Sequence, residues 1–328
     1  MTRRVEQLGK KGLGIHNEVI RGIAVLTLTL LIVTLIPFAG PAVIIMTPLP
    51  IFYYCSRLGR MRGLAALAVA FCAVSGILTF LGHRAHISVL VMIAVTGVIL
   101  SELLRRRYSI EKTFILASLA LFFCGAGFVL YSALLSGVAP WRMVELTIEG
   151  IIGENLKLYE QLNISEDQIT MIRENASQIV DFFTGIFPAL ALSGAVLTVW
   201  LNVMTGRSLL GRNAALFPDF GDLSLWKAPE KLVWVLIAAG VMTLAPGDML
   251  NMVGMNLLIV CCLVYLFQGM AITGFFFRQK KVPRMMRVLV YTLIMVQQYM
   301  VILVIAFGLF DMWIDFRKRI AGIKDVPA

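Results

Sequence analysis

Four amide side chains stand inside long apolar runs of the sequence: Asn256, Gln268, Gln297 and Gln298. An amide surrounded by hydrocarbon needs a hydrogen-bond partner, because an unsatisfied polar group is costly there. That partner is either a polar group on a neighbouring helix or a polar ligand held between helices. The four residues are therefore our candidate ligand-binding positions, and hydrogen bonding between helices is the alternative role for each of them.

The other reactive residues form no catalytic or metal-binding pattern. His83 and His86 are three residues apart, as two metal ligands can be, but no third histidine or nearby carboxylate completes a site. The five cysteines lie in or beside apolar runs and form no C-x-x-C pair. No Walker A loop, G-x-S-x-G motif or H-E-x-x-H motif is present. We therefore expect no catalytic residue, no metal, no cofactor and no enzymatic activity.

Small residues recur at helical spacing in the apolar run 63–81. Ala66 and Ala70 are four residues apart, so they would share one face of a helix. Small residues at this spacing let helix backbones approach closely in lipid. The face either packs within this chain or docks another membrane subunit, and both roles remain open.

The composition explains why apolar runs dominate the chain. Of its 328 residues, 59% are hydrophobic and 15% are charged, and the mean hydropathy is +0.86. A soluble domain carries about 25% charged residues, so this chain has too little polar surface for a water-soluble globule. The net charge of +10 lies in short clusters between the apolar runs. We therefore expect membrane lipids as partners, with anionic lipid beside the basic clusters, and no nucleic acid.

The apolar runs predict an all-α fold, a polytopic transmembrane helical bundle of eight or nine spans. A helix needs about 20 mostly apolar residues to cross the hydrocarbon. The candidate spans are 22–38, 41–55, 63–81, 87–104, 113–136, 179–204, 232–244, 249–277 and 288–310. The second run is short and contains Pro48 and Pro50, which favour a kink or a partly re-entrant segment. The seventh run, 232–244, is also short.

Basic clusters predict the orientation, because cytoplasmic loops are enriched in Lys and Arg. The cluster at the start of the chain favours a cytoplasmic N-terminus. Nine spans place the cluster 278–287 in the cytoplasm but leave the basic tail 317–319 outside. A re-entrant seventh run reverses this conflict, since it brings the tail inside and exposes 278–287. Eight and nine spans both remain open.

Two hydrophilic segments interrupt the spans. Segment 141–177 is mostly acidic and carries apolar residues near helical spacing, so we expect amphipathic helices on the outer surface. Segment 205–231 is predicted to be a cytoplasmic amphipathic connector, with Trp226 as an interface anchor and a candidate residue for docking a partner. The chain is accordingly divided into a six-helix unit 1–204, the connector 205–231 and the C-terminal helices 232–328.

Parts of the sequence are similar to known membrane families. The run Pro48-Leu49-Pro50-Ile51-Phe52, followed by Gly59-Arg60-Met61-Arg62-Gly63 and an alanine-rich helix, looks like a helix junction found in two groups. These are the substrate-binding subunits of energy-coupling-factor vitamin transporters and the MreD-like proteins. The whole chain more closely resembles the uncharacterised YybS-like bacterial membrane family. That resemblance is carried by the Pro-bounded segment 217–229, Asn256, Gln268-Gly269 and the ending Gly308-Leu309-Phe310-Asp311-Met312-Trp313-Ile314-Asp315-Phe316-Arg317.

The resemblance implies a transporter-like core and a bacterial inner-membrane location. The chain departs from the transporter subunits in having two or three further spans, and its first span lacks their alanine at every fourth residue. We hold two hypotheses. In the first, the protein is a non-enzymatic subunit that binds a small molecule or lipid in its bundle, for transport with another membrane subunit. In the second, it is an MreD-like structural or assembly protein that recruits partner proteins.

Overall fold

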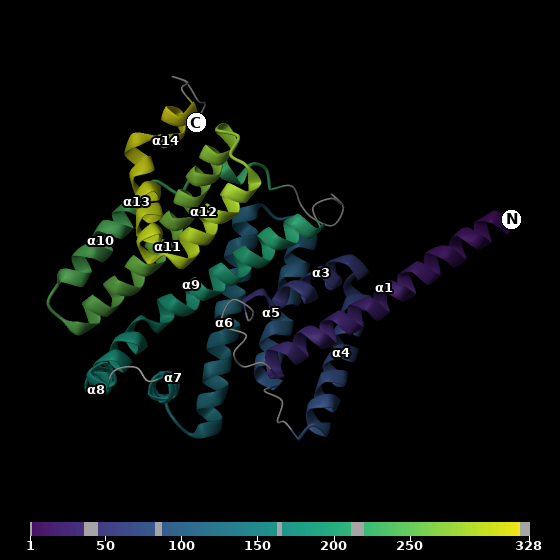
Figure 1. Cartoon of the computed structure of the whole chain (residues 1–328), viewed down its shortest axis with the longest axis horizontal. Helices are drawn as coiled ribbons and strands as arrows, with labels where there is room; N and C mark the ends of the chain where they lie inside the picture. Colours follow the sequence, from purple (N-terminus) through teal and green to yellow (C-terminus); the bar gives the residue numbers. More distant parts are fainter. Residues whose placement is uncertain (1, 36–44, 83–86, 163–165, 211–219, 322–328) are drawn as a thin grey trace. The chain divides into compact units, whose positions relative to one another are not determined.

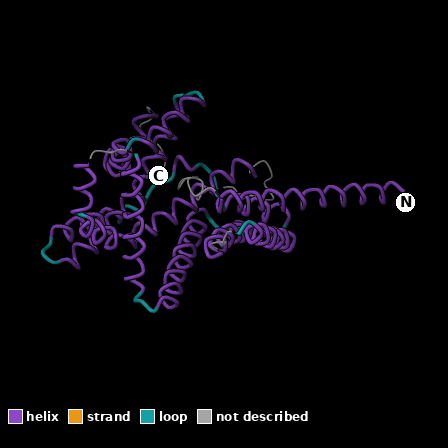
Figure 2. Tube along the Cα trace, turned by 60° about the horizontal axis from the view of Figure 1, so that its bottom comes forward, coloured by secondary structure: helices purple, strands orange, loops and turns teal. Residues whose placement is uncertain are grey.

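The computed structural model describes residues 2–35, 45–82, 87–162, 166–210 and 220–321, and this part of the chain is mostly helical and contains no strand (Figure 1). The helices are α1 (Thr2–Leu35), α3 (Pro48–Leu58), α4 (Arg60–Phe80), α5 (Ile87–Arg105), α6 (Ile110–Ser136), α7 (Pro140–Gln161), α8 (Glu166–Glu174), α9 (Ala176–Leu210), α10 (Leu232–Leu244), α11 (Asp248–Gln279), α12 (Arg284–Val296), α13 (Gln298–Ile314) and α14 (Phe316–Ala321). A 3-10 turn, η1, covers Leu223–Leu225. Figure 2 shows the same path coloured by secondary structure, and the expected all-α class is confirmed for the described residues.

By its internal contacts the chain falls into two compact units. The first contains residues 1–140 and 194–219, and the second contains residues 141–193 and 220–328. These boundaries differ from those expected from the sequence, which are 1–204, 205–231 and 232–328. The difference arises because α9 is a single 35-residue helix whose first half belongs to one unit and whose second half belongs to the other.

In the first unit, α1, α3, α4 and α5 surround a buried apolar core. The core includes Leu30 of α1, Ile51 of α3 and Ala70 of α4. Glycines allow close helix contacts around α3. A Cβ atom on Gly97 of α5 would lie 2.6 Å from the Cβ of Ile51, and one on Gly206 of α9 would lie 2.1 Å from the ring of Phe52. These helices can approach this closely only because those positions carry no side chain.

The short α3 replaces the predicted second span, 41–55. Pro48 stands at the first turn of this 11-residue helix, where a missing N–H costs nothing. Residues 45 and 46 are helical and residue 47 is a turn, so the helical path is interrupted just before Pro48, where α3 begins. At about 1.5 Å per residue, α3 is about 17 Å long and too short to cross the hydrocarbon by itself. Residues 41–44 of the predicted span lie outside the described residues.

In the second unit, α10 and α11 form a tight hairpin. The turn Ala245-Pro246-Gly247 joins them, and Gly247 adopts a φ of 122° that favours glycine. The Nδ2 of Asn251 donates to the carbonyl of Thr243 at 3.0 Å and closes the turn. Farther along α11, a Cβ on Gly254 would lie 2.8 Å from the backbone nitrogen of Thr243, so the two helices touch at that glycine.

The predicted ninth span, 288–310, is wrong as a single helix. It is divided into α12 and α13, which are bent by 104° relative to each other. The break lies at Gln297, whose extended backbone (φ −98°, ψ 107°) ends one helix and precedes the next. Its N–H still donates to the carbonyl of Leu293 at 2.9 Å. The apolar pattern continues through the break, and for that reason hydropathy alone suggests one span.

Five helices in the described residues are long and apolar enough to span a membrane, or six if α12 and α13 together form one span. The five are His16–Leu35, Arg60–Phe80, Ile110–Ser136, Ala176–Leu210 and Asp248–Gln279. Helix α10 is apolar but shorter. The chain therefore has several candidate spans, while the expected number of eight or nine is not confirmed. The amphipathic segment 141–177 contains two helices, α7 and α8.

Candidate functional site

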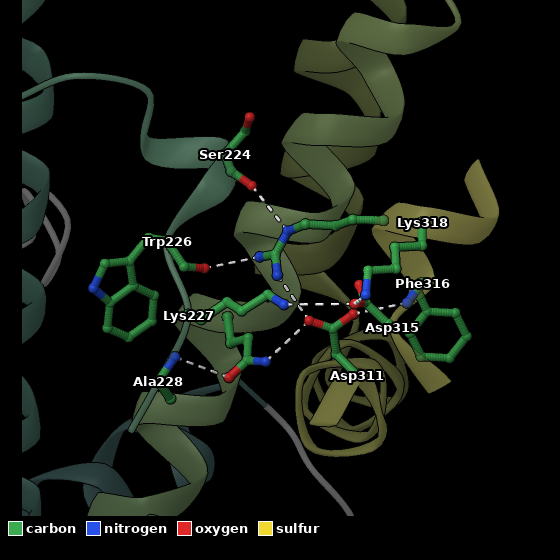
Figure 3. A network of polar contacts seen from close by, with 10 residues as sticks. Ser224, Trp226, Lys227, Ala228, Asp311, Asp315, Phe316 and Lys318 are labelled. Carbon is green, nitrogen blue, oxygen red and sulfur yellow. Dashed lines mark hydrogen bonds and ion pairs between the residues drawn. The ribbon is translucent and has the colours of Figure 1, made fainter. Parts of the chain in front are cut away.

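A buried ion pair lies at the end of α13 in the second unit. Nη1 of Arg317 is 2.8 Å from Oδ2 of Asp311, and the two side chains are 4% and 0% exposed (Figure 3). Removing two charges from water costs several kcal/mol for each ion, so such a pair persists only when the remaining donors and acceptors are also satisfied. The surrounding groups meet that condition.

The carboxylate of Asp311 accepts hydrogen bonds at both oxygens. Oδ1 accepts from the N–H of Phe316 at 2.9 Å, and Oδ2 accepts from Nε2 of Gln268 at 3.1 Å as well as from Arg317. Asp315 makes this geometry possible, because its left-handed backbone (φ 46°) ends α13 and turns the chain into α14. The turn brings the N–H of Phe316 and the guanidinium of Arg317 back to Asp311.

The same network holds the end of the connector, residues 220–231. Arg317 donates from Nε to the carbonyl of Ser224 at 3.1 Å and from Nη2 to the carbonyl of Trp226 at 2.8 Å. Gln268 accepts from the N–H of Ala228 at 3.1 Å through its Oε1. Past η1 this segment follows no helix or strand, so its backbone groups need partners from elsewhere. Two side chains, Arg317 and Gln268, supply three of them (Figure 3).

Weaker ion pairs surround the buried one. Asp315 lies 3.7 Å from Nζ of Lys227 and 3.4 Å from Nζ of Lys318. Arg278, at the end of α11, pairs with Asp222 and donates to the hydroxyl of Ser224 at 2.8 Å. These outer side chains are partly exposed, so each pair contributes at most about 1 kcal/mol.

Charge and burial shift the pKa of two groups in this region. Burial lowers the pKa of Arg317, while Asp311 and Asp315 oppose that effect; an arginine remains protonated at any ordinary pH. Burial alone would raise the pKa of Asp222, but hydrogen bonds from Arg278 and Ser224 outweigh it and hold the pKa below its usual range. Both groups are therefore charged at neutral pH.

Two glycines bring α11 and α13 together beside the ion pair. A Cβ on Gly269 would lie 2.0 Å from the carbonyl oxygen of Val304, and one on Gly308 would lie 2.0 Å from that of Tyr265. The two backbones approach this closely only because neither position carries a Cβ atom. The close crossing places Gln268 within hydrogen-bond distance of Asp311.

Asn256 is the second predicted amide that bonds inside the second unit. Its Oδ1 accepts from the N–H of Ala189 at 2.8 Å, and its Nδ2 donates to the carbonyl of Gly185 at 2.8 Å. In a regular helix, each N–H bonds directly to the carbonyl four residues earlier, as Ala189 would to Gly185. Pro188 lies between these two residues in α9. The amide of Asn256 therefore bridges the turn of α9 that Pro188 disturbs.

The structure does not gather the four predicted amides into one site. Asn256 and Gln268 bond to different partners, whereas Gln297 and Gln298 lie at the break between α12 and α13 with exposed side chains.

The candidate docking residues also differ in their surroundings. Ala66 and Ala70 are buried in the core of the first unit, so they face their own chain. Trp226 is half-buried, and its carbonyl is bonded to Arg317.

Sequence reasoning missed the central residues of this network. Asp311 and Arg317 appeared only within a resembling stretch, and Arg317 was treated as part of a basic tail. The available signal was an acid at the end of an apolar run, followed six residues later by an arginine. A second omission is Asn202, which is fully buried in the first unit and donates to the carbonyl of Ile45 at 2.7 Å.

No group of three or more metal-ligating side chains occurs among the residues that the structure describes. His83 and His86 lie outside them. The polar contacts of the second unit therefore join parts of this chain to one another. Nothing in the geometry of Asp311, Arg317 and Gln268 marks a nucleophile or a proton donor aimed at an open site.

Several long apolar helices define a multi-pass α-helical membrane protein. The model of a family described as "Predicted membrane protein (DUF2232)" matches residues 24–312, and this chain belongs to that family. The match covers both units and ends just after Asp311, before Arg317. No curated protein and no solved structure matches the chain. The resemblances to YybS-like, transporter-subunit and MreD-like proteins stay sequence-based predictions.

Proposed function

We propose that this protein is a non-enzymatic assembly protein of the bacterial inner membrane, which holds a partner protein at its connector. The observation that carries this proposal is the network around Asp311, because it ties an irregular polar segment to apolar helices at residues 224, 226 and 228. A segment held in one shape loses less conformational entropy when a partner binds it. The network thereby favours a docking role for the connector.

The exposed side chains of the connector suit a polypeptide partner. Leu225 is 50% exposed, and Lys227, Glu230 and Lys231 are exposed as well. Trp234, at the start of α10, is 71% exposed. An apolar anchor within a rim of charges is the common composition of protein interfaces.

The same contacts weaken the alternative hypothesis of a subunit that binds a small molecule or lipid in its bundle. Both ends of the Gln268 amide and both ends of the Asn256 amide are bonded within the chain. A ligand that used these amides would have to replace bonds that already exist. Among the predicted binding residues, only Gln297 and Gln298 are exposed.

The proposal includes an orientation. Arg278 and Arg317 both bond to Ser224, so the basic clusters 278–287 and 317–319 begin at one place in the second unit. This supports a topology in which α12 and α13 form a re-entrant pair, and both clusters lie on the cytoplasmic side. The connector then faces the cytoplasm, and so does the N-terminus.

The test is site-specific photocrosslinking from position 225 of the full chain in native membranes. We expect one reproducible adduct with a partner protein that mass spectrometry identifies. Arg317→Met removes the bonds to residues 224 and 226 and should reduce the adduct severalfold, because the segment loses its fixed shape. Lys318→Gln, an exposed neighbour on the same helix, is the matched control and should leave the adduct unchanged.

A different result would favour the ligand hypothesis. If no protein adduct forms at position 225, and a defined small molecule copurifies with the wild-type protein, the assembly role is wrong. Loss of that molecule in Gln297→Leu would assign it to the break between α12 and α13.

A further inference from the structure

The junction between α11 and α12 carries three cations that the chain itself does not neutralise. Lys280, Lys281 and Arg284 are exposed, and within the described part of the chain none of them takes part in an ion pair or a side-chain hydrogen bond. Other basic side chains of the second unit, such as Arg317, are paired with acids of the chain. The three positive charges of segment 280–284 are therefore available to an anion outside the protein.

The backbone of this junction is held in one conformation by bonds within the chain. The N–H of Lys281 donates to the carbonyl of Arg278 at 3.1 Å, and the N–H of Val282 donates to that of Phe277 at 2.9 Å. Arg287 donates from Nε to the carbonyl of Val282 at 2.8 Å and from Nη2 to that of Phe277 at 3.4 Å. A segment that is already ordered loses less conformational entropy when it binds a ligand.

An uncovered apolar face follows the cations in the same helix. Met285, Val288 and Leu289 share one face of α12 and are 85%, 63% and 60% exposed. Residues 288–310 contain no charged side chain, so the border between polar and apolar surroundings falls near Arg287. In a membrane protein, acyl chains cover such a face, and lipid headgroups lie at the level of the cations that precede it.

We propose that segment 280–289 is a binding site for an anionic phospholipid, whose phosphate group is held by the three cations and whose acyl chains lie along the apolar face of α12. Phosphate oxygens accept hydrogen bonds from both ammonium and guanidinium groups. The sequence predicts anionic lipid near the basic clusters in general, whereas the unpaired cations and the adjoining apolar face define one site. The inference uses no residue of the connector and does not depend on the proposed docking of a partner there.

The test is photolabelling of the full-length protein in vesicles that contain equal amounts of phosphatidylglycerol and phosphatidylcholine. A trace of one lipid or the other carries a diazirine in its acyl chain, and mass spectrometry maps the adducts. Each basic residue near an anionic surface favours anionic lipid, so the phosphatidylglycerol probe should label peptides that contain residues 285–289 about five times more than the phosphatidylcholine probe does. The preference should fall when salt is raised to about 1 M, where the screening length is about 3 Å.

A triple variant tests the role of the cations, by the substitutions Lys280→Gln, Lys281→Gln and Arg284→Gln. The two probes should then label residues 285–289 equally, because lipid still covers the apolar face but the charge preference is lost. The matched control removes the same formal charge from exposed positions of α7 and α8, by Arg142→Gln, Lys157→Gln and Arg173→Gln, and should keep the preference.

Three results would each overturn the proposal. The first is equal labelling by the two probes in the wild-type protein, a comparison that needs no variant. The second is a preference that persists in the triple variant. The third is a protein adduct, in native membranes, from a photoreactive residue at position 285, because it would show that a polypeptide and not lipid covers this face.

Discussion

Arg278 and Arg317 both bind Ser224. Arg278 donates to the Ser224 hydroxyl at 2.8 Å, and Arg317 donates to the Ser224 carbonyl at 3.1 Å. In the sequence, the basic clusters containing these two arginines compete for one side of the membrane. Their meeting at Ser224 supports our proposal that α12 and α13, which are bent by 104°, form a re-entrant pair with both clusters on one side.

The first prediction concerns the side on which these clusters lie. Cysteines introduced as Lys280→Cys and Arg319→Cys should react with a membrane-impermeant maleimide from the same side, accessible in inverted vesicles and protected in intact cells. Glu154→Cys, in the acidic helix α7, should show the opposite pattern. Labelling of the two basic positions from opposite sides would instead support a continuous ninth span.

The second prediction concerns the buried ion pair. Asp311→Leu leaves Arg317 buried without a counter-charge and should lower the free energy of unfolding by about 3–5 kcal/mol. Asp311→Leu combined with Arg317→Met should recover much of that loss, since the unpaired charge is removed. Unfolding in mixed micelles measures both, with Lys318→Gln as a control expected within about 0.5 kcal/mol of wild type. Equal losses in the single and double variants would contradict the role of an unpaired charge.

The third prediction concerns the amide beside Pro188. Asn256→Leu removes the bonds to Ala189 and Gly185 and should destabilise the second unit by about 1–3 kcal/mol. The effect should shrink in a Pro188→Ala background, where α9 can complete its own backbone bonds. Asn155→Leu, which removes only an exposed bond to the carbonyl of Ile151 four residues earlier in α7, serves as the control. A loss that is identical in both backgrounds would show that Asn256 does not act through the proline.

The fourth prediction concerns the crossing of α11 and α13. Gly269→Ala places a methyl group 2.0 Å from the carbonyl of Val304, so the helices must separate at a cost of about 1–3 kcal/mol. Gly240→Ala is the matched control, because nothing lies within 4 Å of its Cβ position. It should be neutral or slightly stabilising, since alanine favours a helix. Thermal unfolding in detergent separates the two outcomes, and a tolerated Gly269→Ala would disprove the close contact.

The fifth prediction concerns pH and the Asp222–Arg278 pair. The pKa of Asp222 is held below its usual range, so its stabilising effect is fully present above the unfolded value of about 3.9 and is lost as pH falls through the folded value. Because the pair is partly exposed, the loss should be below about 1 kcal/mol. The free energy of unfolding should be measured between about pH 6 and about pH 3, a range that includes the unfolded pKa. In Asp222→Asn this free energy should depend less steeply on pH than in wild type. An unchanged dependence would exclude this pair as its source.

The sequence predicted the fold well where apolar length decides the structure. The long helices α4, α6 and α11 follow the predicted runs closely, and α10 matches 232–244 residue for residue. Hydropathy failed at Gln297, because a break in direction leaves the apolar pattern unchanged on both sides. At Pro48 the interruption expected from proline is present, since a turn at residue 47 separates helical residues 45 and 46 from α3.

The candidate site was predictable only in part. Gln268 and Asn256 were identified because an amide within an apolar run demands a partner, and both have partners. Their partners were not predictable, since Gln268 bonds to Asp311, 43 residues away, and Asn256 bonds to α9, 67 residues away. Contacts over such separations depend on which helices cross, and that information is not contained in local spacing.

The division of α9 between the two units imposes an order on biosynthesis. The first unit needs residues 194–210, among them Asn202, which bonds to the carbonyl of Ile45, and Gly206, which admits the ring of Phe52. These residues leave the ribosome only after the whole segment 141–193 of the second unit. The Ile45 carbonyl must therefore wait for its Asn202 partner until α7, α8 and the first half of α9 have been made, so the early unit is completed only after synthesis of the late unit has begun.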